Sequence, residues 1–282
     1  MADAWWIWLV ALFAVSFVIG VVAVVAGVGG GVLFVPIVSG FFPFHLDFVR
    51  GVGLVFALAG TLAAGPSLLR NRLASLRLAV PLALSGSIAS FAGALAGLAL
   101  PTEVVQTALG ATVLAIAIVV WRTGDAAAGT GEADALGTIL RLRGRYEDPA
   151  EGAVVDWRTR RTLTGFVAFA GIGFLGGVFG LGAGFANVPV LNFVMAAPLK
   201  VAVGTSGLII SIVNSSAAWV YIHRGALLPA LAVPAILGVM LGSRLGASLL
   251  ARTPASVVRR VVIAVLLLAG ARSLGRGTGL WP

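Results

Sequence analysis

Runs of apolar residues long enough to cross a bilayer recur along the whole chain. The first, WWIWLVALFAVSFVIGVVAVVAG, covers residues 5–27. A membrane-spanning helix needs about 20 such residues. Only 10% of the residues are charged, against about a quarter in a soluble domain. We therefore predict an all-α polytopic membrane protein, with long helices near residues 5–27, 50–70, 77–99, 103–122, 162–180, 202–222, 227–250 and 255–274.

Glycines and prolines recur at a constant offset between the two halves of the chain. The stretch GVGGGVLFVP at 27–36 is followed, 153 residues on, by GLGAGFANVP at 180–189. The same offset links further pairs: Gly51 with Gly204, Pro81 with Pro234, and Gly93 with Gly246. We therefore predict a tandem duplication. Its parts are a first membrane repeat at 1–122, a polar cytoplasmic linker at 123–161 and a second membrane repeat at 162–282.

Each glycine-rich stretch is followed by a short apolar piece, near 32–44 and 185–197. About 13 residues make a helix of about 20 Å, which is shorter than the ~30 Å hydrocarbon core. Close helix packing would explain the glycines but not the prolines at 36 and 189. We favour a broken or re-entrant segment in each repeat, whose helix N-terminus would attract an anion.

Two membrane topologies fit the sequence. Eight spans, about four in each repeat, leave the short pieces re-entrant and put both termini in the cytoplasm. Ten spans make the repeats inverted and put the termini outside. Both put the arginine-rich central loop in the cytoplasm, as the positive-inside rule requires. We favour eight because the short pieces are short.

The second repeat is the more polar one, because Asn187, Asn192, Thr205 and Asn214 align with Phe34, Ser39, Val52 and Thr61. Taken singly, each polar residue is explained as well by an interhelical hydrogen bond. Arg244 lies inside an apolar run, either as a functional charge or as a side chain that reaches back to the interface. The candidate substrate-binding residues are Gly29, Gly30, Gly31, Gly182, Ala183, Gly184, Asn187, Asn192, Thr205, Ser206, Asn214 and Arg244.

The residue types that the chain lacks, or lacks inside its apolar runs, restrict the class of substrate and reaction. The chain has no cysteine, and every Asp and Glu lies in a loop or at a helix end, which disfavours a cation substrate and carboxylate-based coupling. The GTSG motif at 204–207 is similar to that of rhomboid proteases, but His223 lies about 25 Å from Ser206 along the same helix. We expect no enzyme activity, catalytic residue, metal or cofactor. The expected partners are a small anion and the lipid bilayer, without nucleic acid, and a homo-oligomer is left open.

The stretches GVGGGVLFVP, GLGAGFANVPVLN and KVAVGTSGLIISIVNS resemble the TauE/SafE sulfite exporter family, also called the toluenesulfonate uptake permease family. The resemblance covers both repeats. It implies a multi-pass permease of the plasma (inner) membrane for sulfite, sulfonates or related small organic anions. The motif positions it carries over are Gly27, Gly29, Gly31, Pro36, Gly180, Gly182, Gly184, Asn187, Pro189, Gly204, Thr205 and Ser206. The first repeat departs from the pattern, with RGVGL at 50–54 where the second has VGTSG.

We therefore expect a permease that exports small sulfur-containing anions by alternating access around two broken helices. Two alternatives stay open. One is an anion channel on the same scaffold. The other is a membrane scaffold or sensor that transports nothing.

Overall fold

The computed structural model describes residues 5–26, 29–70, 74–122, 134–148, 153–182, 184–249 and 255–280. Within these ranges the chain is mostly helical, as predicted, and all the long helices expected from the sequence form. They are α1 (Trp5–Ala26), α3 (Leu46–Arg70), α4 (Leu76–Ala99), α5 (Thr102–Arg122), α7 (Thr162–Phe179), α9 (Leu199–His223), α10 (Pro229–Leu249) and α11 (Ala255–Gly277).

Three shorter pieces complete the helical part. They are α2 (Gly30–Phe41), α6 (Ala135–Ile139) and α8 (Gly184–Pro189), which continues as a π-helix, η1 (Val190–Val194). Among the described residues, six helices are long and apolar enough to cross a membrane: α1, α3, α4, α7, α9 and α10. A membrane protein with several spans is therefore supported, while a count of eight crossings stays a prediction.

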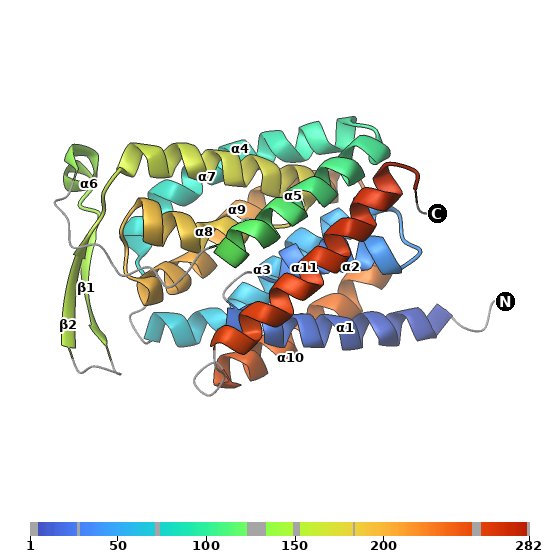
Figure 1. Cartoon of the computed structure of the whole chain (residues 1–282), viewed down its shortest axis with the longest axis horizontal. Helices are drawn as coiled ribbons and strands as arrows, with labels where there is room; N and C mark the ends of the chain where they lie inside the picture. The colour runs from blue at the N-terminus through green and yellow to red at the C-terminus, as the bar shows by residue number, and fades with distance from the viewer. Residues whose placement is uncertain are drawn as a thin grey trace.

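Helices from the two halves of the chain pack directly against each other. The main contacts pair α1 with α10, α4 with α7, α5 with α11, α4 with α9, α3 with α9 and α3 with α10. Figure 1 shows the start of α1 and the end of α11 at one end of the bundle, with the segment between the halves at the other. The rings of Trp8 and Phe42 lie 5.7 Å apart, so the end of α2 returns beside the start of α1.

Glycines allow the closest of these helix pairs. A Cβ atom on Gly242 of α10 would overlap the carbonyl oxygen of Phe17 of α1, and one on Gly238 would lie 2.6 Å from the carbonyl oxygen of Phe13. The four-residue spacing puts these glycines on one face of α10. Small residues at this spacing let helix backbones approach closely, which is how helices associate where lipid removes the hydrophobic driving force.

The described part of the linker is folded, whereas the sequence predicts only that this segment is polar. After α6, strands β1 (Arg143–Asp148) and β2 (Ala153–Arg158) form an antiparallel hairpin. Leu142 and Trp157 are buried and belong to the same hydrophobic cluster as Met195, beside η1. The hairpin is thus packed onto the second half of the chain by one of its two faces.

Asp134 ties the linker to the start of α7. One carboxylate oxygen accepts from Thr162 N at 2.9 Å and the other from Thr162 Oγ1 at 2.7 Å and from Gly137 N at 3.2 Å. Burial raises the pKa of Asp134, but these hydrogen bonds outweigh it, so the pKa lies below its ordinary value of 3.8. Asp134 therefore caps two helices at once.

Candidate functional site at the two helix breaks

Both glycine-rich stretches interrupt a helix. Helix α1 ends at Ala26 and α2 begins at Gly30, while α7 ends at Phe179 and α8 begins at Gly184. Within the breaks, the φ angles are 76° at Gly29, 66° at Gly180 and 72° at Gly182. These left-handed conformations strain any residue with a side chain, which explains why glycine stands there. Gly27, Val28 and the predicted site residue Ala183 lie outside the described residues.

The two breaks touch each other through backbone atoms. A Cβ atom on Gly31 would overlap the carbonyl oxygen of Leu181, and one on Gly29 would lie 3.1 Å from Cα of Gly184. Gly30, the first residue of α2, also has no room for a side chain, because its Cβ would lie 2.6 Å from the ring of Phe56. The structure thus brings together the predicted glycines of both halves, which are far apart in the sequence.

Three predicted polar residues of α8 and α9 are buried with side-chain atoms that bond to nothing described. Asn187 is 0% exposed, Asn214 is 1% exposed and Ser206 is 2% exposed. Both amide atoms of each asparagine, and the hydroxyl of Ser206, lack a hydrogen-bond partner in the described part of the chain. Buried polar atoms are almost always paired, so such a group indicates a missing partner.

These three residues lie on helices that are in contact. Asn187 is on α8, which packs against α9, the helix that carries Ser206 and Asn214. Asn214 also borders the second break, because a Cβ on Gly182 would lie 2.7 Å from its Nδ2 atom. Along α9, the eight residues from Ser206 to Asn214 span about 12 Å. The protein interior therefore contains hydrogen-bond donors and acceptors from side chains of both α8 and α9.

Two other predicted polar residues already have partners in the protein. The Nδ2 atom of Asn192 donates to the carbonyl oxygen of Ala197 at 2.8 Å. The Oγ1 atom of Thr205 accepts from Ser75 N at 3.1 Å, which joins α9 to the start of α4. These contacts give Asn192 and Thr205 structural roles and leave less of their polar capacity for a ligand.

The predicted cation Arg244 lies apart from the buried group. It is exposed on α10, whereas Gly242 and Gly246 of the same helix are buried against α1. Two residues along a helix turn the side chain by about 200°, so Arg244 points away from that packed face. Arg244 is therefore not one of the buried polar residues, unlike Asn187, Ser206 and Asn214.

Comparison with known proteins gives the chain a family. The sequence profile of the family described as "Sulfite exporter TauE/SafE" matches residues 12–273. The chain belongs to this family. It is also 31% identical over 111 residues to "Probable membrane transporter protein YunE" of Bacillus subtilis (strain 168). That match covers 39% of this chain and 40% of the relative's length. No solved structure gives a significant match.

Membership of the TauE/SafE family confirms the resemblance found from the glycine motifs. The family is one of membrane transporters, which agrees with the expectation that the chain is not an enzyme. The family match spans both breaks and the three unpartnered residues Asn187, Ser206 and Asn214.

The TauE/SafE chain also contains a buried cation that the sequence analysis missed. Arg50, on the second turn of α3, is 1% exposed. Its guanidinium bonds to Asp47 Oδ1 at 2.8 Å and to the carbonyl oxygen of Val178, and it lies 5.3 Å from the centre of the Tyr221 ring. Tyr221 Oη donates to the carbonyl oxygen of Gly177 at 3.0 Å. Arg50 and Tyr221 together satisfy carbonyls at the end of α7, where the second break begins.

The end of α2 is bound in a similar way. Arg272 and Arg276 of α11 donate to the carbonyl oxygens of Gly40 and Ser39, in the last turn of α2. The carbonyl end of a helix carries a partial negative charge, which arginine neutralises. At the other end of α2, Gly29 provides no side-chain cap. The positive amino end of α2, at the junction of the breaks, is therefore not neutralised by its own cap residue.

Proposed function

We propose that this protein is a permease for small sulfur-containing anions, acting mainly in export, and that the substrate binds where the two helix breaks meet. The observation that carries the proposal is the set of unpartnered buried polar groups on Asn187, Ser206 and Asn214. Family membership supports transport. A ligand that accepts and donates hydrogen bonds would complete these groups.

The electrostatics of the junction favour an anion. The first turn of α2 points free N–H groups at the junction, and the dipole of a helix places a partial positive charge there. Arg272 and Arg276 bind carbonyls at the end of α2 that lies away from the junction, and Arg50, paired with Asp47, binds a carbonyl at the end of α7 beside the second break. No Asp or Glu lies among the buried polar residues of the described chain, so a cation would find no carboxylate there. Sulfite and sulfonates have the oxygen acceptors that such a site binds.

We further propose that the membrane domain is an inverted repeat of two five-segment halves, the alternative that was less favoured from the sequence. The contacts between the halves are reciprocal: α1 packs on α10 as α7 packs on the equivalent α4, and α4 packs on α9 as α10 packs on the equivalent α3. The termini lie opposite the hairpin in Figure 1, as an odd number of segments in each half requires. Repeats with opposite orientation are a frequent basis of alternating access.

The orientation follows from the arginines. The hairpin and the turns around it carry six of them: Arg141, Arg143, Arg145, Arg158, Arg160 and Arg161. The positive-inside rule puts this end in the cytoplasm of a plasma-membrane protein, and so puts both termini outside. Because the chain has no cysteine, Thr138→Cys and Leu280→Cys can be labelled singly without background. A membrane-impermeant maleimide should label only Leu280→Cys in intact cells, whereas labelling of neither or of both would contradict this topology.

The function is tested by efflux from proteoliposomes loaded with sulfite, taurine or chloride. The proposal predicts saturable sulfite or sulfonate flux that shows counterflow and is lost in Asn187→Leu. Flux that does not saturate would favour an anion channel on the same scaffold. Absence of flux for all three anions from folded protein would overturn the transport proposal and favour a scaffold or sensor.

A further inference from the structure

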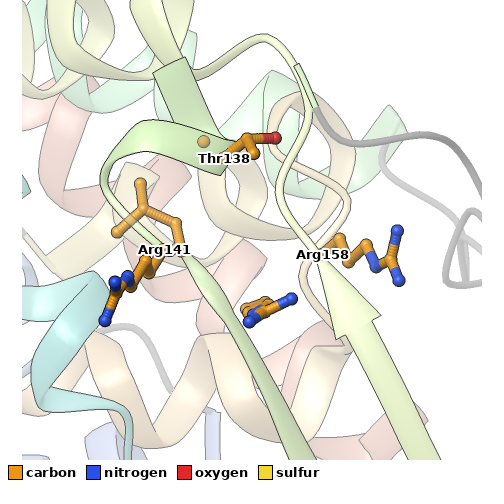
Figure 2. Close-up of a pocket in the computed structure, with 6 residues that line it drawn as sticks. Thr138, Arg141 and Arg158 are labelled. Carbon is orange, nitrogen blue, oxygen red and sulfur yellow. The ribbon is translucent and has the colours of Figure 1, made fainter. Parts of the chain in front are cut away.

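A small basic pocket lies in the linker, away from the helix breaks. It has a volume of ≈ 160 Å³ and is lined by Gly137, Thr138, Arg141, Leu142, Arg143 and Arg158. Figure 2 shows Arg141 and Arg158 flanking it, with Thr138 at its edge. All three arginines are exposed. The transport proposal gives this pocket no role.

The hairpin holds two of these arginines directly opposite each other. Arg143 pairs with Arg158 in the register of β1 and β2. Like charges at facing positions destabilise a hairpin. Two residues along, the facing pair is Arg145 and Asp156, joined by a salt bridge of 2.8 Å. Asp156 also attracts Arg158 electrostatically, but it is already bound through both carboxylate oxygens to Arg145.

The pocket is held in place by the opposite face of the hairpin. Leu142 and Trp157 are buried against the membrane domain, and Gly144 leaves room for the Trp157 ring. The hydroxyl of Thr159 donates to the carbonyl oxygen of Leu142 at 3.2 Å, and Arg160 N donates to the carbonyl oxygen of Met195 at 3.0 Å. The arginines of the other face are therefore positioned together on a packed element.

Apolar side chains stand exposed next to the pocket. On α6 and the turn after it, Ile139 is 73% exposed, Leu140 is 40% exposed and Leu136 is 38% exposed. Exposed apolar side chains beside arginines are the combination that binds at the interface of an anionic bilayer. Guanidinium groups bind phosphate oxygens well because their N–H donors match the geometry.

We propose that the pocket formed by Arg141, Arg143 and Arg158 binds the phosphoryl group of an anionic phospholipid, while Leu136, Ile139 and Leu140 contact its acyl region. The phosphoryl group then supplies the negative charge that balances the facing pair Arg143 and Arg158. The linker is then fixed to the leaflet beside the membrane domain. This assignment does not depend on which anion the membrane domain moves.

The test is native mass spectrometry of the full chain in detergent, titrated with phosphatidylglycerol or with phosphatidylcholine. Each arginine near a membrane surface contributes about 1 kcal/mol to the attraction, which is about a fivefold change in affinity. Arg143→Gln and Arg158→Gln should each weaken phosphatidylglycerol binding about fivefold. The matched control is Arg77→Gln, which removes one exposed charge from the start of α4 and should change nothing.

Thermal unfolding of each variant checks that the exposed substitutions leave the fold intact, and Arg141→Gln replaces any variant that fails this check. Equal binding of phosphatidylglycerol to wild type and pocket variants would overturn the proposal. So would equal affinity of the wild type for the two lipids. Glycerol phosphate provides the soluble comparison at constant ionic strength. If its binding requires the arginines while lipid binding does not, the pocket is a site for soluble phosphate and the lipid assignment is wrong.

Discussion

Replacing Asn187 by leucine should abolish transport without destabilising the protein. The two side chains have similar volume, and both amide atoms of Asn187 are buried without a described partner. Each unsatisfied buried polar group costs about 1–3 kcal/mol in the folded state. Leucine removes that cost, so the free energy of unfolding should stay the same or rise by about 1–2 kcal/mol. Flux should be lost because the ligand loses an amide that has no partner among the residues that the structure describes.

Asn192 provides the matched control, because it is the same residue type in the same half-helix. Its amide donates to the carbonyl oxygen of Ala197 at 2.8 Å. Asn192→Leu breaks this bond and leaves the buried carbonyl unpaired, which should lower the free energy of unfolding by about 1–3 kcal/mol. Any flux lost should then follow the amount of folded protein.

The assay measures unfolding in detergent by tryptophan fluorescence and sulfite flux in proteoliposomes that contain equal amounts of folded protein. The two variants should move in opposite directions: Asn187→Leu stable and inactive, Asn192→Leu less stable and active for each folded molecule. The reasoning is refuted if Asn187→Leu is destabilised as much as Asn192→Leu. In that case the Asn187 amide bonds within the protein and is not held for a ligand.

Three further changes test other parts of the structure. Gly31→Ala should lower the free energy of unfolding by at least about 1–3 kcal/mol and prevent flux, because its Cβ would overlap a carbonyl of the second break. Gly65→Ala is the control and should be neutral or stabilising, because open space surrounds Gly65. The yield of folded protein in detergent compares the two variants. Arg50→Met should lower thermal stability by about 3 kcal/mol through loss of its bonds to Asp47 and α7, and an unchanged melting temperature would contradict this. Asp134→Ala should cost about 1–2 kcal/mol at neutral pH as a lost helix cap. Because the folded-state pKa of Asp134 is lowered, its contribution is present above its ordinary pKa of 3.8 and disappears as pH falls through the lowered value, so the two proteins should become equally stable in acid.

The helices and their interruptions could be predicted from the sequence because local rules determine them. The length of an apolar run sets where a membrane helix starts and ends, and glycine followed by proline marks a break. The short pieces expected at 32–44 and 185–197 correspond to α2 at Gly30–Phe41 and to α8 with η1 at Gly184–Val194. The polar residues of α8 and α9 were also identifiable, since few polar side chains occur in such apolar surroundings.

What the sequence could not reveal depends on contacts between distant segments. Arg50 follows Asp47 near the start of a helix and so resembles an interfacial residue. Its burial is created by Tyr221 and the end of α7, more than a hundred residues away. For Arg244, an apolar run indicates depth in the membrane but not the direction of the side chain, which is set by the packing of Gly242 and Gly246 on α1.

The linker was difficult to predict for a related reason. Its first strand, RGRYED, is polar, and among the side chains that the structure describes Leu142 and Trp157 pack the hairpin onto the membrane domain. One buried tryptophan gives too weak an alternation to distinguish a packed hairpin from a solvated loop. The length of the half-helices leaves the number of membrane crossings open in a similar way. A short helix suggests a re-entrant piece, but Phe42 at the end of α2 reaches Trp8 near the start of α1, so the break and α2 together cover much of the return.

The distribution of arginine around the breaks matters for turnover as well as for binding. Arg272 and Arg276 lie at the carbonyl end of α2, away from the junction, whereas Arg50 lies at the end of α7 beside the second break and is paired with Asp47. A helix end contributes about half an elementary charge, whereas a buried guanidinium contributes a whole one and would hold an oxyanion bidentately. Transport requires a site that releases its ligand as readily as it binds it. Dipoles and neutral amides at the junction, with the one full charge beside it, Arg50, paired with Asp47, therefore suit an anion held with a dissociation constant of about 1 μM to 1 mM. A substitution that adds a cation among the buried groups without a partner, such as Ser206→Lys, should tighten anion binding and slow flux; faster flux would contradict this account.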